Sequence, residues 1–217
     1  MVVRNRTKKV EEALVVRHRQ EPEPLAEGEL GGSVTMSRAL AQSAHGLTLN
    51  EARVMMLATR CIDPRKSPYA YAKDGYVKVR VTADEFAQMA EMAGEEGRTP
   101  TAAYEGLKAA CDKLFDRRAT WREGKKIIKL AWVWKATYHE GEGWAEVCFS
   151  PDMTPHLFML GSKFVRYRLE MARGLRSTYS VNLLRLLMTQ KDTGFLAITL
   201  DDFKHAMEVP ISYQYKD

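Results

Sequence analysis

The segment Val79-Arg-Val-Thr-Ala-Asp-Glu-Phe86 decides the fold, because it recurs later in the chain as Leu196-Ala-Ile-Thr-Leu-Asp-Asp-Phe203. In each copy apolar residues alternate, and a threonine follows with an acidic residue three positions further on. Alternation indicates a strand, and the threonine–acid spacing is typical of a helix N-terminus. We therefore predict the same strand-to-helix step twice, and hence two related units in one chain.

The first copy of this step stands inside a longer series of elements. Their order, helix, strand, two helices and a β-hairpin, is that of a winged helix, which is a helix-turn-helix with a β-hairpin wing. We place this first winged helix at residues 33–150. The elements expected in it are helices over 37–44, 49–62, 83–93 and 101–115, and strands over 76–81, 118–122, 127–137 and 144–149.

The second copy follows a connector over 151–176, in which short helices are expected at 151–160 and 162–173. A helix at 179–190, a strand at 195–199 and a helix at 200–207 then repeat the first steps of the earlier unit. The printed sequence ends at Asp217, where a third helix would begin. We predict an α+β fold of tandem winged helices, whose second unit, at 177–217, is incomplete and lacks its recognition helix and wing.

Composition and charge narrow the class of protein. The chain has 217 residues, of which 45% are hydrophobic, enough for a sizeable core. No apolar run approaches the roughly 18 residues of a membrane span, so no membrane partner is expected. The three cysteines are widely spaced, which predicts neither a disulfide framework nor a zinc site and favours a reducing cytoplasm.

The charge is distributed unevenly. The net charge of +5 and the pI near 9.0 favour anionic partners. Residues 1–20 are basic, and the following glutamates, prolines and glycines break any regular element. We expect a flexible charged tail over 1–32; contact of this arm with nucleic acid and simple solvation both stay open.

Several segments together carry a resemblance to a known family. They are Leu47-Thr-Leu-Asn-Glu-Ala-Arg53, the basic, tryptophan-bearing hairpin, Arg176-Ser-Thr-Tyr-Ser-Val-Asn-Leu-Leu-Arg185, the second repeat, and Val209-Pro-Ile-Ser-Tyr213. Over roughly residues 35–217 the chain resembles the plasmid replication initiator (Rep) proteins, which bind repeated origin sequences called iterons.

The resemblance implies a bacterial cytoplasmic protein with two winged helices. In that family the first domain dimerises and contacts the DNA backbone, and the third helix of the second domain reads bases. Dimers repress their own promoter, whereas monomers bind iterons and open the origin with host replication proteins. We expect this chain to depart from the pattern in lacking the second recognition helix. The expected function is plasmid replication initiation on iteron DNA; the alternative is a truncated dimerisation module that pairs with and inhibits a full-length initiator.

The densest group of cations lies in the hairpin region. Cations on a wing can lie along phosphates, whereas the alternative interpretation is a solvated hairpin whose lysines protect a sheet edge. We favour phosphate contact. The residues are Arg117, Arg118, Arg122, Lys125, Lys126, Lys129 and Lys135, and the first six are the ones we assign to DNA.

Two further groups of cations lie outside the hairpin region. The connector group consists of Lys163, Arg166, Arg168, Arg173 and Arg176, with Arg166 and Arg173 expected on one helix face; phosphate contact and solvation stay equally open there. In the third helix, Arg98 and Lys108 are the cations that could face DNA. Because that helix is short of polar base readers, we predict weak or absent base reading by the first unit.

The remaining expectations concern dimerisation and catalysis. Strand alternation favours core or dimer packing for the tryptophans, and we expect Trp132, Trp134 and Val147 at a homodimer interface. No phosphate-binding loop is present and the histidines are isolated, so neither a catalytic site, a metal nor a cofactor is expected.

Overall fold

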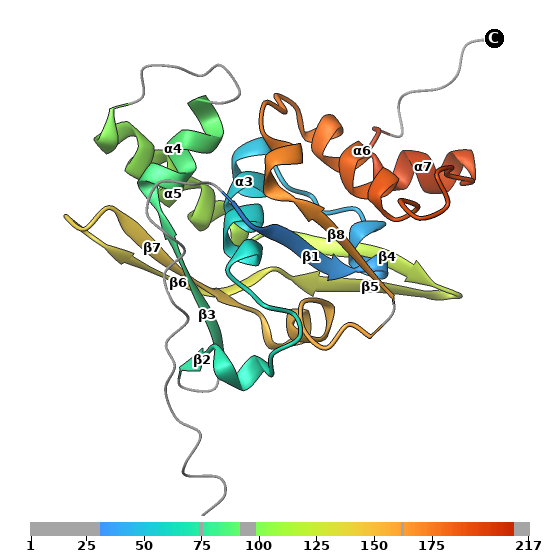
Figure 1. Cartoon of the computed structure of the whole chain (residues 1–217), viewed down its shortest axis with the longest axis horizontal. Helices are drawn as coiled ribbons and strands as arrows, with labels where there is room; N and C mark the ends of the chain where they lie inside the picture. The colour runs from blue at the N-terminus through green and yellow to red at the C-terminus, as the bar shows by residue number, and fades with distance from the viewer. Residues whose placement is uncertain (1–30, 74–75, 92–98, 162, 211–217) are drawn as a thin grey trace, which may run out of the picture.

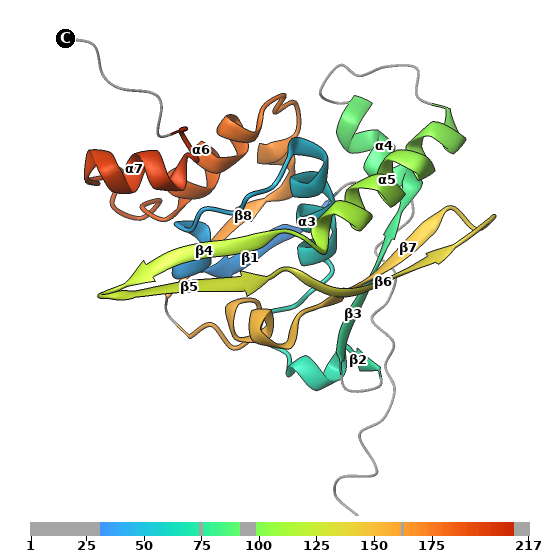
Figure 2. The same cartoon turned by 180° about the vertical axis from the view of Figure 1, so that it is seen from behind.

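The computed structural model describes residues 31–73, 76–91, 99–161 and 163–210 (Figure 1). The expected tail over 1–32 lies outside this part of the chain, apart from Gly31 and Gly32, and so does Arg98. Figures 1 and 2 show the molecule from opposite sides, with a three-helix unit and its sheet at one end and a separate β-ribbon at the other.

The three-helix unit is a winged helix, as predicted. Helices α3 (Leu49–Arg60), α4 (Ala83–Glu91) and α5 (Pro100–Leu114) pack on one another and on a sheet in the order β2-β3-β7-β6. The strands are β2 (Ala72–Lys73), β3 (Tyr76–Thr82), β7 (Trp144–Phe149) and β6 (Val133–His139). Their antiparallel pairing leaves a turn at 140–143 between β6 and β7, and this turn is the tip of the wing.

Helix α3 is the centre of the core. Its first turn is fixed by a capping box, in which Glu51 Oε2 accepts a hydrogen bond from the Thr48 backbone N–H at 3.0 Å. Every residue from Glu51 to Arg60 is buried, including Leu57 at 0% exposure. Burial of a leucine side chain contributes roughly 1.5–3 kcal/mol, so this helix anchors the fold.

The repeated strand-to-helix step is confirmed at its caps. Thr82 Oγ1 accepts from the Glu85 backbone N–H at 3.2 Å, and Thr199 Oγ1 accepts from the Asp202 backbone N–H at 3.1 Å. The second of these helices is α7 (Leu200–Ala206). The strand expected at 195–199 is wrong, however, because no strand of the described residues lies beside it to accept its hydrogen bonds.

The helix expected at 162–173 is replaced by a strand. Strand β8 (Phe164–Arg168) pairs antiparallel with β1 (Ser33–Ser37), a strand that the sequence did not predict. The helix expected at 37–44 forms in a shorter version as α2 (Arg38–Ala41). The burial of Val165 and Tyr167 between exposed neighbours is the period-2 pattern of a strand, which the interpretation as a helix overlooked.

The connector therefore packs as part of the first unit. Residues 151–176 contain two 3-10 turns, η2 (Pro151–His156) and η3 (Leu169–Ala172), with β8 between them. Helix α6 (Thr178–Met188) follows and contacts α3 and β8. The assignment of residues 177–217 to a second winged helix stays a prediction.

The strand expected over 127–137 is split into two. Strand β5 (Lys126–Ala131) pairs with β4 (Arg118–Glu123), whereas β6 joins the wing sheet. The break falls at Trp132, whose side chain is buried and whose Nε1 donates to the His45 carbonyl at 3.2 Å. The basic hairpin is thus a separate two-stranded ribbon and not the wing, which corrects the sequence-based interpretation.

Candidate nucleic-acid interface

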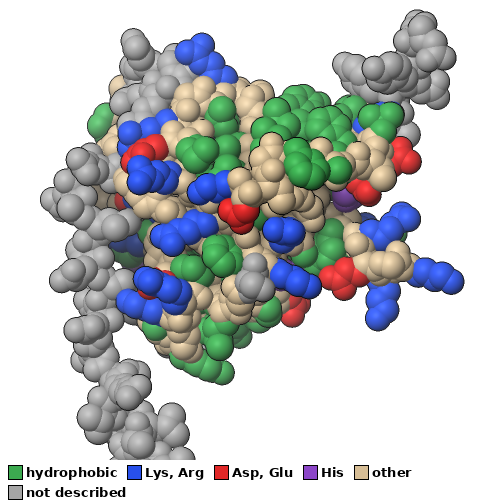
Figure 3. Space-filling model, turned by 45° about the vertical axis from the view of Figure 1, so that its right-hand side comes forward, with side chains coloured by type: hydrophobic (Ala, Val, Ile, Leu, Met, Phe, Trp, Pro, Cys, Tyr) green, Lys and Arg blue, Asp and Glu red, His purple; other side chains and the backbone are tan. Residues whose placement is uncertain are grey.

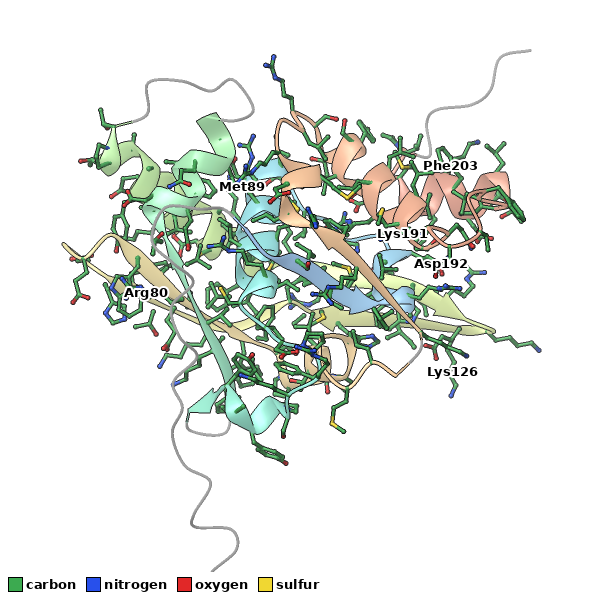
Figure 4. The ribbon with its side chains drawn as sticks, viewed as in Figure 1. Arg80, Met89, Lys126, Lys191, Asp192 and Phe203 are labelled. Carbon is green, nitrogen blue, oxygen red and sulfur yellow. The ribbon has the colours of Figure 1, made fainter. Side chains whose placement is uncertain are left out.

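The β4–β5 ribbon presents a row of cations on its outer face. The antiparallel register places Arg118, Arg122 and Lys129 on the face opposite Trp121. All three side chains are exposed. Lys125 and Lys126 are also exposed and lie at the turn, where Gly124 adopts a positive φ of 59°. Five cations therefore project from one narrow element, with Lys126 at its far end in Figure 4.

The body of the protein holds this ribbon in place. On the inner face, the buried Trp121 ring packs edge-on against His156, with centroids 5.0 Å apart. Thr120 exchanges two backbone hydrogen bonds with Ala44, of 2.7 and 2.9 Å. Its carbonyl also lies 3.1 Å from Nε2 of His205, which belongs to α7. The cations are therefore displayed on an ordered support.

The positive charge of the ribbon exceeds its one negative charge, that of Glu123 opposite Lys126. No ion pair among the described residues involves Arg118, Arg122 or any of the three ribbon lysines. Arg118 donates to the carbonyls of Phe115 and Arg117, which stabilises the end of α5 without cancelling the charge. An exposed row of unpaired cations is the kind of surface that phosphates bind.

Two predicted DNA contacts are engaged elsewhere. Arg117 forms a bidentate ion pair with Glu51, whose side chain is fully buried. Burial alone would raise the pKa of Glu51, but the hydrogen bonds from Arg117 and Thr48 outweigh it and lower the pKa. Lys108 lies 3.7 Å from Glu140 and over the Tyr138 ring. Arg117 is thus a structural residue, and Lys108 is paired.

The surface formed by α5 and the β6–β7 wing carries both signs of charge. Glu105 and Asp112 are exposed on α5, and Glu140 and Glu142 lie at the tip of the wing. This is the surface that a winged helix commonly turns to DNA. Its acidic side chains oppose phosphate binding, so the ribbon is the better candidate; weak base reading by the first unit stays a prediction.

The connector cations lie on the other side of the molecule from the ribbon. Arg166 and Arg168 project from β8, and Lys163 precedes it. Strands β1 and β8 face the viewer in Figure 1 and β4 and β5 do so in Figure 2. Figure 3 shows Lys and Arg side chains spread over the β1–β8 side.

The expected helix face shared by Arg166 and Arg173 does not exist, because Arg166 is on a strand and Arg173 follows η3. Arg173 is half-buried and Arg176 is exposed. Arg38 is a cation on the β1–β8 side that the sequence did not single out; its backbone N–H donates to the Lys163 carbonyl at 3.1 Å. Only that pairing, invisible in the sequence, brings it near β8.

The residues expected at a dimer interface do not share a surface. Trp132 and Val147 are 2% and 0% exposed. They are core residues of this chain and do not lie on an interface, which corrects the expectation. Trp134 is 61% exposed and stacks on Tyr76, with centroids 6.4 Å apart. The apolar run Ala131-Trp132-Val133 interrupts the alternation. It was the signal in the sequence that Trp132 and Trp134 do not lie on the same face of one strand.

The described part of the chain contains no group of three His, Cys, Asp or Glu residues placed to hold a metal ion. None of its helices is both long and apolar enough to cross a membrane. Cys111 is buried, which raises the pKa of its thiol to about 12 and makes it a poor nucleophile.

The fold and the ribbon define a winged-helix protein with a basic β-ribbon. Comparison with known proteins makes the class more specific. The family model described as "Initiator Replication protein, WH1" matches residues 33–188, and the chain belongs to this family. The matched range runs through β8 and α6, past the boundary expected at 150.

Two solved structures are similar to this chain. The Pi initiator protein in complex with iteron DNA is 20% identical, with 88% of this chain and 77% of that chain covered and a TM-score of 0.62. The WH1 domain of MSBI1.176, a replication protein isolated from a multiple sclerosis patient, is 23% identical over 51% of this chain and 76% of that chain, with a TM-score of 0.35. No curated protein matches the sequence. The likeness to the Pi protein supports the winged-helix fold.

Proposed function

We propose that this protein is a replication initiator that binds double-stranded DNA and contacts phosphates with the β4–β5 ribbon. The observation that carries the proposal is a group of five exposed cations without an ion pair, three on the outer face and two at the turn, on an element fixed to the core. Membership of the initiator family supports the role in replication. The residues assigned to DNA are Arg118, Arg122, Lys125, Lys126 and Lys129.

The mechanism of this binding is electrostatic. Each phosphate that a cation neutralises releases condensed counterions, so affinity falls with salt by about 0.9 logarithmic units per contact and per tenfold change in salt. A flat row of arginines and lysines carries no base code of its own, and it sets position and register. The ribbon would therefore anchor the protein, with sequence recognition supplied elsewhere.

The finer parts of the function are proposed on the same basis. We assign the protein to plasmid origins and their iterons, because the similar Pi protein was solved with iteron DNA. Repression of its own promoter, a homodimer, and contacts with host replication proteins in the bacterial cytoplasm belong to the same proposal. No catalytic step is assigned to the chain.

The test compares two triple variants that remove the same charge from opposite sides of the molecule. One is R122A/K125A/K129A on the ribbon, and the other is K163A/R166A/R168A at β8. Fluorescence anisotropy with duplex DNA over a salt series should show the salt slope falling by about 2.7 for the ribbon variant, or 0.9 for each lost contact. The β8 variant should keep the slope of the unchanged protein.

Equal losses in both variants would show general charge attraction and would contradict an assignment to the ribbon. Loss in the β8 variant alone would move the interface to that side. Circular dichroism melting checks that both variants fold, which is expected because the six side chains are exposed.

A second candidate function is a dimerisation module that pairs with and inhibits a full-length initiator. The observation in its favour is Trp134, which is 61% exposed on β6, an edge strand of the wing sheet. A large exposed aromatic side chain on an open strand edge is a typical anchor for a second chain. Sedimentation at tens of micromolar should show a dimer that the W134A variant loses; a monomer at that concentration would count against this function.

A further inference from the structure

A single carboxylate joins the end of α7 to the first winged helix. Glu208 Oε1 accepts hydrogen bonds from the backbone N–H groups of His45, at 2.7 Å, and Gly46, at 3.1 Å. The Asn182 Nδ2 of α6 donates to the same oxygen at 3.5 Å. The loop at 45–46 immediately precedes α3, so this carboxylate connects elements from the two ends of the described chain.

The backbone of Glu208 is in an unusual conformation. Its φ is +55°, and Met159 is the only other non-glycine residue of the described chain with a positive φ. Glu208 follows α7, where the Val209 N–H closes the helix on the Lys204 carbonyl at 3.0 Å. Glycine is the usual residue at this left-handed position, because the Cβ atom of any other residue makes the backbone conformation costly. A glutamate held there calls for a role of its side chain.

The contact continues into a buried polar network. Arg185 of α6 is 4% exposed and donates to the Asn182 Oδ1 and to the Nδ1 of His45. His45 Nε2 lies 2.7 Å from the Leu40 carbonyl, so this nitrogen carries the proton and Nδ1 is free to accept. Glu208, Asn182, Arg185 and His45 thus form one continuous chain of hydrogen bonds between the α6–α7 pair and the first unit.

One side of this network is open to water. A cleft of about 340 Å³ lies beside it, lined by Thr48 and Arg117 from the first unit and by Tyr179, Met207 and Glu208 from the α6–α7 side. Glu208 itself is only half-buried. Arg185 and His45 are enclosed, whereas the carboxylate stands at the solvent edge, so its bonds are the ones that can open without exposing the core.

We propose that Glu208 is a latch that fixes α7 against the 45–46 loop of the first winged helix, and that its release lets α7 move while α6 stays packed. A costly backbone conformation and three hydrogen bonds at one oxygen meet at this residue. The inference concerns the internal arrangement of the chain and does not rest on DNA binding.

Three variants separate the effect of the Glu208 carboxylate from the effect of the positive φ. E208G removes the carboxylate and relieves the positive φ. E208Q keeps an oxygen acceptor without the charge. M159G relieves the other positive φ, at an exposed side chain, and serves as the matched control.

The first readout is amide hydrogen exchange. In E208G the His45 and Gly46 amides should exchange about tenfold faster or more, because both lose a hydrogen bond to a charged group. E208Q should show a smaller increase, and M159G none. The amides of α5 should be unchanged in all three. Exchange at 45–46 no faster in E208G than in M159G would overturn the proposal, as would an equal increase in α5, which would show general destabilisation only.

The second readout is the orientation itself. Spin labels at the exposed residues Glu105 on α5 and Asp201 on α7, in a background with Cys61→Ser, report the distance between α5 and α7. The distance distribution should be single and narrow in the parent and in M159G, and broader or bimodal in E208G. An unchanged distribution in E208G would reject the latch even if the amides exchanged faster.

Discussion

The Arg117 guanidinium and the Glu51 carboxylate form a bidentate ion pair, with Nε to Oε2 at 2.7 Å and Nη2 to Oε1 at 3.1 Å. The pair links the segment after α5 to the first turn of α3. The Glu51 side chain is fully buried, and the Arg117 side chain is 34% exposed. Arginine 117 therefore holds the winged helix together, although its position in a run of cations predicted contact with DNA.

The R117A variant should lose stability and keep its salt-dependent DNA binding. Removing one partner of a buried pair leaves an uncompensated charge, and with the partial exposure of Arg117 we expect a loss of about 2 kcal/mol in the free energy of unfolding. Urea denaturation measures this loss. R122A, which changes an exposed arginine of the ribbon, is the control and should stay within about 0.5 kcal/mol. A stable R117A protein with a reduced salt slope would return Arg117 to the DNA interface.

The stability of the protein should fall as the pH drops below 6.5. Burial, and then the nearby Arg185, lower the pKa of His45 well below its ordinary value of 6.5. Burial also lowers the pKa of His156. Just below pH 6.5 the unfolded chain binds protons on these histidines, whereas the folded protein does not. The stability that their neutral forms contribute is therefore present above the unfolded pKa and is lost as the pH falls. Each such proton contributes at most about 1.4 kcal/mol per pH unit.

Urea denaturation at pH 7.5, 6.5 and 5.5 measures this dependence. H156Q should reduce the change in the free energy of unfolding between pH 6.5 and 5.5. The double variant H45Q/H156Q should remove most of that change. A double variant with the slope of the unchanged protein would place the proton uptake on other groups.

Charge added to the outer face of the ribbon should strengthen binding to DNA. Ile127 is 61% exposed and lies opposite Arg122 in the β4–β5 register. The I127K variant should raise the salt slope by about 0.9 and leave stability within about 0.5 kcal/mol. Its neighbour Ile128 faces inward opposite Trp121 and packs against the core, so I128K is the matched control. That control should cost about 2 kcal/mol in stability, because it brings a charge to an apolar surface.

The parts of the fold that the sequence predicted are those set by local chemistry. The Thr82 and Thr199 caps bond within three residues, so the spacing of threonine and acid contained the whole interaction. Helix α3 was likewise visible as a broad apolar face. Helices α4 and α7 form where the repeat predicted them, and α3 forms where its apolar face did.

The errors fall where pairing with distant residues decides the structure. The segment Phe164–Arg168 becomes a strand because β1 lies beside it, and its basic, apolar sequence also fits a helix. Its partner strand β1 is remote in sequence, and no local pattern shows that the two segments pair. The same holds for the site, because only the buried position of Glu51 shows that Arg117 is paired and unavailable to phosphate.

The break between β5 and β6 gives the sharpest contrast between two neighbouring tryptophans. Trp132 is 2% exposed, donates to the His45 carbonyl and packs at 4.9 Å on the His45 ring, whereas Trp134 is 61% exposed. W132F should lower the free energy of unfolding by about 2 kcal/mol, because it leaves a cavity and a buried carbonyl without its donor. W134F, the same change two residues on, should stay within about 0.5 kcal/mol. Urea denaturation compares the two, and similar losses in both would mean that the strand continues unbroken through Trp132 with both rings on one face.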